Sequence, residues 1–215
     1  CTGDSVSFSI ASTGTGLNYQ WRKGLVNLIN VGNISGANSA VLTIFPVSLI
    51  DAATDYNVIV SGACAPNDTS LMASLTVNAG AVITSEPVSQ ISCTGDSISF
   101  TVVATGTGLA YQWRRGIINL INAGNISGVN TAVLTINPVS LIDAANDYNV
   151  LVSGILCPSA DTSVFVSLNV NAAPVIITEP LSQISCAGDS ISFTVVATGT
   201  GLTYQWQEDQ GGGFV

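Results

Sequence analysis

The chain has 215 residues, of which 8% are charged, with 13 acidic side chains, 4 basic ones and no histidine. A formal net charge of −9 argues against nucleic acid as a partner, because phosphate binding needs clustered lysine and arginine. Hydrophobic residues make up 47% of the chain but come in short runs, none approaching the ~20 apolar residues of a membrane-spanning helix. Membrane insertion is therefore not expected.

Three near-copies of one segment divide the chain into tandem repeats. The copies begin at Cys1, Cys93 and Cys186, at offsets of 92 and 93 residues, and each ends in Tyr-Gln-Trp. A period of this length predicts about two and a third small domains. The predicted domains are a first repeat over 1–79 that lacks its leading strand, a complete repeat over 80–171, and a truncated third repeat over 172–215.

Alternating side chains predict the strands. Val6, Phe8 and Ile10 alternate with serines, which is typical of a strand with one buried face. The other elements expected in repeat one are strands over 17–21, 25–29, 40–44, 56–60 and 69–77, a turn over 22–24, a loop over 32–36 and a corner over 49–55. Repeat two follows the same path and adds a leading strand over 81–92, split at Glu86-Pro87. Short strands without helical periodicity predict antiparallel sandwiches.

The order of these features resembles an immunoglobulin-like domain. Residues 3–10 are similar to strand B of that fold, Tyr19-Gln20-Trp21 to strand C with its core tryptophan, and Asp51 with Tyr56 to the tyrosine corner that opens strand F. The resemblance implies an all-β fold: tandem immunoglobulin-like antiparallel β-sandwiches in a head-to-tail array. It also implies that each core holds large aromatic side chains, namely Trp21, Trp113, Trp206, Tyr56 and Tyr148.

The cysteines are displaced from the antibody pattern, whose inter-sheet positions hold Ile10 and Val58 in repeat one. Their placement resembles the immunoglobulin-like repeats of giant bacterial cell-surface proteins, including gliding-type adhesins. Those repeats also read C-x-G before strand B, A-x-G-x-G-L-x-Y-Q-W into strand C, and V-S-G-x-C after strand F, as in Val60-Ser-Gly-Ala-Cys64. This resemblance implies export to the cell surface, where the oxidising setting permits disulfides.

The topology of an immunoglobulin-like sandwich implies how the cysteines pair. Strands B and F run the same way, so Cys1 and Cys64 belong at opposite ends of one domain, beyond the ~7 Å Cα reach of a disulfide. In a head-to-tail array the turn before strand B faces the loop after strand F of the next domain. The resemblance therefore predicts an inter-domain disulfide between Cys1 and Cys157, with partners for Cys64, Cys93 and Cys186 outside this sequence. Free thiols and an in-domain pair are the alternatives.

Catalysis is not expected, since no base is placed to activate a serine, and no cofactor or metal is predicted. Recurrent aspartates at the corner (Asp51, Asp55, Asp143 and Asp147) are interpreted as turn caps, with a calcium site as the alternative. All four basic residues follow a core tryptophan and are interpreted as a solvated turn rather than a site for acidic glycans: Arg22, Lys23, Arg114 and Arg115.

Two kinds of glycosylation motif are present. The Asp-Ser-aliphatic motif resembles the O-glycan attachment site of bacterial surface proteins of this type, and it places candidate sites at Ser5, Ser97 and Ser190. The alternative interpretation of this motif is a turn that leads into a strand and carries no glycan. The N-x-Ser/Thr pattern, a weaker signal in a bacterial chain, occurs at Asn33, Asn67 and Asn125.

The sequence thus predicts a structural segment, the stalk or fibre shaft of an extracellular bacterial adhesin or filament. Its expected partners are neighbouring repeats, further copies in a filament and covalent glycans. The alternative is a carbohydrate- or protein-binding module, for which exposed Tyr19, Tyr111 and Tyr204 would be natural stacking residues, although their spacing from tryptophan predicts that they pack inside. A third hypothesis is self-assembly by strand addition to an open edge of repeat one.

Overall fold

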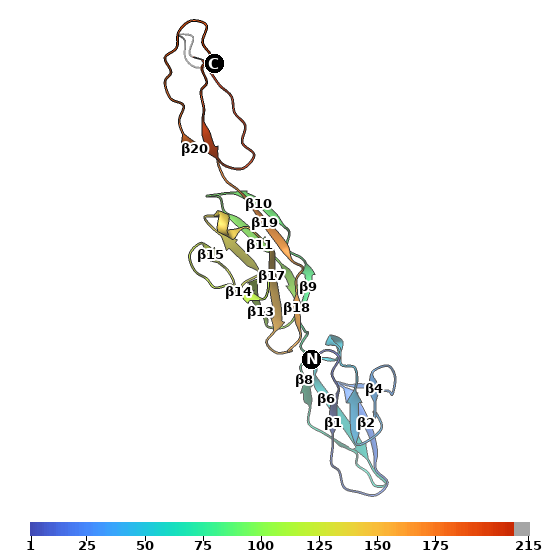
Figure 1. Ribbon diagram of the computed structural model, residues 1–215. Helices are drawn as coiled ribbons and strands as arrows, with labels where there is room; N and C mark the ends of the chain where they lie inside the picture. Colours follow the sequence, from blue (N-terminus) through green and yellow to red (C-terminus); the bar gives the residue numbers. More distant parts are fainter. Residues whose placement is uncertain (209–215) are drawn as a thin grey trace. The chain divides into compact units, whose positions relative to one another are not determined.

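A computed structural model describes residues 1–208, which form β-strands and two short 3₁₀ helices (Figure 1). No α-helix occurs within this range, and none of its helices is long and apolar enough to cross a membrane. The all-β architecture agrees with the alternating sequence pattern.

The chain divides into two compact units, whose limits differ from those of the sequence repeats. The first unit comprises Cys1–Ser85, Val103–Tyr111 and Leu151–Thr162. The second comprises Glu86–Val102, Gln112–Val150 and the chain from Ser163 onward. Segments from one end of repeat two therefore belong to the same compact unit as the whole of repeat one.

Repeat one is a sandwich of two sheets. One sheet has the order β1-β5-β4, and the other has the order β3-β2-β6-β7, with β8 also paired to β6. The elements are β1 (Val6–Ser9), β2 (Asn18–Lys23), β3 (Val26–Asn27), β4 (Ile34–Ser35), β5 (Val41–Ile44), η1 (Leu49–Asp51), β6 (Ala53–Ser61), β7 (Asp68–Thr69) and β8 (Ala73–Leu75).

Aromatic and aliphatic side chains fill the space between these sheets. Phe8 on β1 lies opposite Leu42 on β5, and Trp21 on β2 lies opposite Val58 on β6. The Phe8 ring stacks on Tyr56 with centroids 5.0 Å apart. Val58, Trp21 and Tyr56 are buried, so hydrocarbon packing occupies the region where antibody domains carry a disulfide.

Repeat two has the same plan with a leading strand added, split as expected into β9 and β10. Its sheets have the orders β11-β16-β15 and β10-β19-β17-β13-β14, with β18 on β17 and a separate β9–β12 pair. The elements are β9 (Val82–Ser85), β10 (Gln90–Cys93), β11 (Ile98–Thr101), β12 (Val103–Thr105), β13 (Leu109–Arg115), β14 (Ile118–Asn119), β15 (Ile126–Ser127), β16 (Val133–Ile136), η2 (Leu141–Asp143), β17 (Ala145–Gly154), β18 (Ala160–Thr162) and β19 (Val166–Asn171). Most pairs are antiparallel, but β10 and β19 are parallel.

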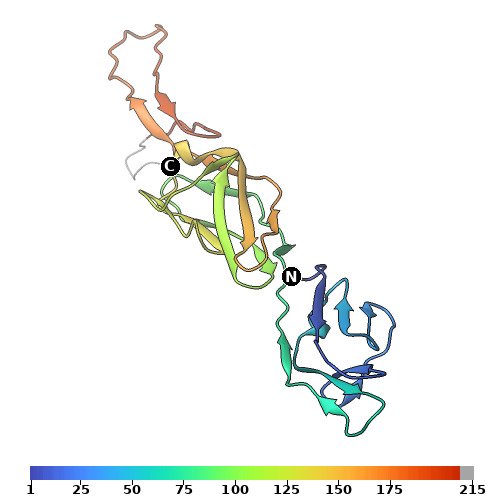
Figure 2. The same ribbon diagram turned by 90° about the horizontal axis from the view of Figure 1, so that it is seen from below.

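The third repeat contains one strand pair, β20 (Val175–Thr178) with β21 (Val196–Thr198), and long connecting segments (Figure 2). The prediction that Trp206 is a core residue is wrong: its side chain is 53% exposed, against 4% for Trp21 and 0% for Trp113. Tyr204, also expected inside, is 57% exposed. Within residues 1–208, no strands equivalent to β5 and β6 follow β21 to cover these rings. Residues 209–215 of the predicted third repeat lie outside the described range.

Three local predictions also differ from the structure. The expected loop over 32–36 contains β4, and β2 continues through Lys23 into the expected turn. The expected final strand over 69–77 is interrupted between β7 and β8, where the hydroxyl of Ser70 accepts a hydrogen bond from the Val58 N–H (3.0 Å). A side chain thus replaces a backbone group in the ladder, and the strand breaks there.

Candidate functional site

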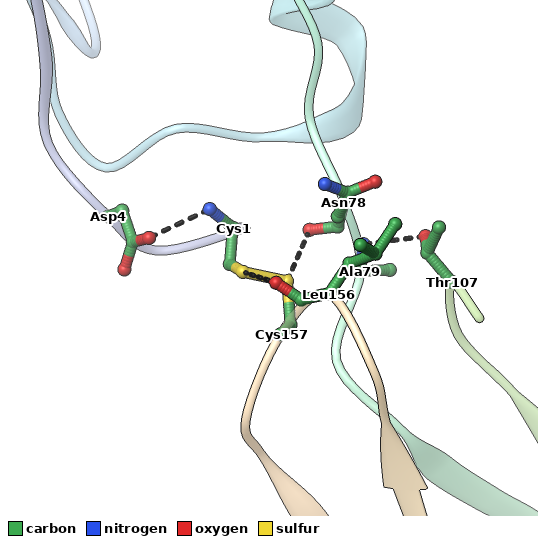
Figure 3. The surroundings of a disulfide bond; sticks show 7 residues. All are labelled: Cys1, Asp4, Asn78, Ala79, Thr107, Leu156 and Cys157. Carbon is green, nitrogen blue, oxygen red and sulfur yellow. Dashed lines mark hydrogen bonds and ion pairs between the residues drawn. A yellow bond between two sulfur atoms is a disulfide. The ribbon is translucent and has the colours of Figure 1, made fainter. Parts of the chain in front are cut away.

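A disulfide joins Cys1 of repeat one to Cys157 of repeat two, with their Cα atoms 5.8 Å apart (Figure 3). Both cysteines lie in the first compact unit. The sulfur of Cys157 lies 3.3 Å from the carbonyl oxygen of Asn78, and the amino group of Cys1 donates to the carboxylate of Asp4 (2.7 Å). The bridge spans 156 residues of sequence, which is more than one repeat.

Hydrogen bonds fix the chain where it passes from repeat one to repeat two. The N–H of Thr2 donates to the carbonyl oxygen of Asn78 (2.9 Å). The N–H of Ala79 donates to the hydroxyl of Thr107, and the N–H of Thr107 donates back to the carbonyl oxygen of Ala79, both at 3.0 Å (Figure 3). This reciprocal pair satisfies backbone groups that a connecting segment would otherwise leave to water.

The same bonds recur in the second unit, where repeat two passes into repeat three. The N–H of Thr94 donates to the carbonyl oxygen of Asn171 (2.9 Å). The N–H of Ala172 donates to the hydroxyl of Thr200, and the N–H of Thr200 donates to the carbonyl oxygen of Ala172, again at 3.0 Å. Because the bonds repeat one period later, they are a property of the repeating sequence.

The other three cysteines, Cys64, Cys93 and Cys186, are free and exposed. Cys93 occupies the position of Cys1 in its repeat, and its N–H donates to the Asp96 carboxylate (3.1 Å), as the amino group of Cys1 does to Asp4. The second unit therefore presents Cys93 in the setting in which the first unit presents Cys1.

The corner before β17 shows the role of Asp143, one of the recurrent aspartates. The carboxylate of Asp143 accepts hydrogen bonds from the N–H of Ser140 (2.7 Å), from its hydroxyl (2.9 Å) and from the amide of Asn125 (2.8 Å). The hydroxyl of Tyr148 donates to the carbonyl oxygen of Asp143 (2.8 Å). The carboxylate thus caps the turn, and no cluster of three or more metal-ligating side chains occurs in residues 1–208.

Replacement of Tyr148 by phenylalanine is expected to lower the free energy of unfolding by about 1–2 kcal/mol, because a buried hydrogen bond is lost. Burial raises the pKa of Tyr148 above 10.0, Arg115 lowers it, and Asp143 and Asp147 raise it. The folded state therefore keeps the proton more tightly than the unfolded chain does. This stability is fully present below pH ~10 and is lost as the pH rises through the folded-state pKa.

Urea titrations between pH 7 and pH 11, followed by circular dichroism, test this expectation. The wild type should lose stability more steeply above pH ~10 than the Tyr148→Phe chain, which lacks the ionising group. The exposed Tyr204 provides a matched control, since Tyr204→Phe should leave the urea midpoint unchanged at pH 7. Identical pH profiles for wild type and Tyr148→Phe would contradict the argument.

The interpretation of the basic residues as a solvated turn is wrong. The Nε of Arg22 donates to the Asn57 side chain (2.9 Å), and the Nε of Arg114 donates to Asn149 (3.0 Å). Lys23 donates to the carbonyl oxygen of Ile50 (2.8 Å). The two arginine contacts join the strand that carries tryptophan to the neighbouring strand, β6 or β17, and the lysine contact joins it to the corner. The signal in the sequence is the asparagine that follows each core tyrosine, and both asparagines are buried.

The candidate glycosylation sites differ in accessibility. Ser5, Ser97 and Ser190 are exposed, and so is Asn67. The amides of Asn33 and Asn125 are engaged, since each donates to a proline carbonyl oxygen and to the carboxylate of the corner aspartate. A glycan on either amide would have to disrupt these bonds.

The three-dimensional fold has clear counterparts among solved structures. An I-band fragment from titin matches with a TM-score of 0.73 at 20% identity, over 99% of this chain and 76% of that chain. The N-terminal eight immunoglobulin domains of Down Syndrome Cell Adhesion Molecule match with a TM-score of 0.61 at 16% identity, over 79% of this chain and 23% of that one. No family model and no curated protein matches the sequence.

Structural matches at these low sequence identities establish the fold of this chain. They do not establish its biochemical role. The two sheets of repeat one, the tyrosine corner and the core tryptophans of repeats one and two all agree with the matched architecture. The chain has the fold of tandem immunoglobulin-like β-sandwiches.

Proposed function

We propose that this chain is a structural segment, the stalk or fibre shaft of an extracellular bacterial adhesin or filament. The observation that carries the proposal is the disulfide between Cys1 and Cys157, which links one repeat covalently to the next. A shaft that transmits tension needs its modules joined, whereas independent binding modules do not. The role requires no catalysis.

The length of the bridge strengthens the argument. It spans 156 residues, while the cysteines that begin successive repeats lie 92 and 93 residues apart. If Cys93 and Cys186 formed equivalent bridges in a longer array, each closed loop would begin before the previous one ended. Overlapping loops would hold a partly unfolded module in place, which suits a load-bearing shaft at a cell surface of the gliding-adhesin type.

The proposal also includes O-linked glycans on three serines. Ser5, Ser97 and Ser190 lie at equivalent positions, directly before a strand or its counterpart, and are exposed. With 8% charged residues the surface has few ionic groups to keep it hydrated, so O-linked sugars on these serines would supply that solubility.

Non-reducing peptide mapping of native material by mass spectrometry tests both parts of the proposal. The expected result is a Cys1–Cys157 cross-linked peptide pair, with hexose-type mass additions on the peptides that contain Ser5, Ser97 and Ser190. Peptides that carry the unmodified Asn33 and Asn125 serve as internal controls, because their amides are engaged. A Cys1–Cys64 link would refute the covalent shaft, and bare serine peptides would refute the glycan coat.

A further inference from the structure

Large aliphatic side chains are exposed at equivalent positions of repeats one and two. They lie on the turn that follows the tryptophan-bearing strand and on the corner. In repeat one they are Leu25, Val26, Leu49 and Ile50, which we call the apolar tip. The apolar tip of repeat two consists of Ile117, Ile118, Leu141 and Ile142, each 92 residues later. An exposed patch made only of large aliphatic residues is typical of an interaction surface.

Hydrogen bonds bring the turn and the corner of repeat one together. Val26 lies opposite Lys23 in the β3–β2 pair, and the ammonium group of Lys23 donates to the carbonyl oxygen of Ile50 (2.8 Å). The N–H of Gly24 donates to the carbonyl oxygen of Asp55 near the start of β6 (3.0 Å). The four side chains of the tip therefore belong to one patch of surface.

Repeat two builds its tip with the same contacts. Ile118 lies opposite Arg115 in the β14–β13 pair, and the guanidinium of Arg115 donates to the carbonyl oxygen of Ile142 (3.2 Å). The N–H of Gly116 donates to the carbonyl oxygen of Asp147 (2.8 Å). The construction of the tip is thus a property of the repeat.

The tips are exposed to the same extent although their surroundings along the chain differ. Repeat one has no leading strand in this sequence and is followed by a complete repeat, whereas repeat two has its leading strand and is followed by one strand pair within residues 1–208. Nevertheless, Leu25 is 88% exposed and Ile117 90%, while Ile50 is 84% exposed and Ile142 83%. The exposure of the tips therefore does not arise from the limits of the sequence.

Each tip lies at the edge of a sheet. β3 and β14 are the last strands of their sheets, and Val26 and Ile118 are their first residues. Exposed edge strands are normally protected by charged side chains or by proline, because an apolar edge attracts other chains. Strands of two residues offer few backbone groups for strand addition, so a contact at these edges must come mainly from the aliphatic side chains.

We propose that the apolar tips are contact sites for a second copy of this chain. Each tip places a cation beside a carboxylate. In repeat two the Nε of Arg115 lies 3.7 Å from the carboxylate of Asp147, and in repeat one Lys23 lies opposite Tyr56, the neighbour of Asp55. Such a pair is self-complementary across a two-fold axis, since the cation of each copy can approach the anion of the other.

The net charge of the chain favours this part of the surface for self-association. At a formal net charge of −9, two copies repel each other over most of their surface. All four basic residues of the chain belong to the two strands that border the tips, β2 and β13. The repulsion between copies is therefore weakest at the tips. The same net charge disfavours an anionic lipid surface as the occupant.

A single tip is too small to hold two chains together. A stable interface covers about 800 Å² of each partner and involves about 20–30 residues a side, whereas a tip has four aliphatic residues. A second copy carries two tips with the same separation, so both can engage at once, and the second contact forms at high effective concentration. An unrelated partner would need two matching sites of its own.

Sedimentation velocity of the intact chain over a range of concentrations tests the proposal. The free thiols of Cys64, Cys93 and Cys186 would be replaced by serine throughout to exclude disulfide-linked dimers, and the Cys1–Cys157 bridge would be kept. The expected result is a reversible dimer whose fraction rises with concentration. Hydrogen exchange in the dimer should slow in peptides that contain β3, β14 and the two corners, and this measurement needs no substitution in a tip.

Substitutions in the tips should weaken the dimer. Leu25→Ser with Ile50→Ser alters the tip of repeat one, and Ile117→Ser with Ile142→Ser alters that of repeat two. Each pair is expected to raise the dissociation constant of the dimer at least about tenfold, and all four changes together should leave only monomer. Because these side chains are exposed, the substitutions should leave the fold intact.

The matched control is Ile91→Ser with Ile155→Ser, which removes two isoleucines that are also exposed but lie outside the tips. This control should dimerise as the parent chain does. A loss of the dimer in the control equal to that in the tip variants would contradict the assignment of the contact to the tips.

A chain that stays monomeric up to about 1 mM would overturn the proposal. So would a dimer that survives all four tip substitutions, because its contact would lie elsewhere. Monomers that float with phosphatidylcholine vesicles, and lose this binding in the tip variants, would assign the tips to lipid and overturn the proposed occupant. The shaft proposal rests on the Cys1–Cys157 bridge, which all these chains retain, so none of these outcomes decides it.

Discussion

Replacing Trp113 with alanine is expected to lower the free energy of unfolding of repeat two by about 3–5 kcal/mol. The indole is fully buried, and its ring lies 6.2 Å from that of Phe100 between centroids. Its Nε1 donates to the carbonyl oxygen of Thr131 (3.0 Å). Truncation would leave a cavity in the core and would also remove this hydrogen bond, and both changes lower the stability.

Hydrogen exchange measured by mass spectrometry in increasing urea would report this loss through peptides from β13 and β17. Those strands carry the core of repeat two, and their exchange follows its opening. The matched control is Trp206→Ala, which removes the same side chain at the equivalent position of repeat three. Because Trp206 is 53% exposed, this change is expected to alter stability by no more than ~0.5 kcal/mol. Equal losses for the two variants would contradict the structure.

The contrast between these tryptophans shows what local sequence can and cannot predict. The three copies end in the same Tyr-Gln-Trp, and alternation correctly places Trp21 and Trp113 on the inner face of a strand. Burial, however, depends on a second sheet that closes over that face. Repeat three has the residue pattern without the covering strands among residues 1–208, so Trp206 is exposed.

The sequence alone could not predict the polar contacts between strands that lie far apart along the chain. Arg22 and Arg114 follow core tryptophans and look like turn residues, but each donates to an asparagine 35 residues later. Such pairs become visible only when strand register is known. The break at Ser70 has the same origin, because its hydroxyl replaces a backbone partner for Val58 across the sheet. By contrast, the corner and the split leading strand follow from local signals: Asp51 before Tyr56, and Glu86-Pro87.

Stretching the chain from its two ends should give an unfolded length that differs between oxidised and reduced samples by about 500 Å. The disulfide joins cysteines with a sequence separation of 156 and keeps the chain between them out of the load path. An extended chain spans about 3.3–3.6 Å per residue. Single-molecule force spectroscopy with handles that avoid thiol chemistry would measure the difference. The Cys157→Ser chain should behave as the reduced wild type does under all conditions.

Cys64→Ser provides the matched control, because this thiol is free and its loss should not change the unfolded length. Equal lengths for oxidised wild type and Cys157→Ser would mean that no bridge carries the load, and the proposed shaft would lose its basis. If the difference is found, it extends to any longer array in which Cys93 is bridged as Cys1 is. If a disulfide with a sequence separation of 156 started every 92 or 93 residues, only short stretches of the chain would be free to extend. The disulfide bonds would then carry most of the tension.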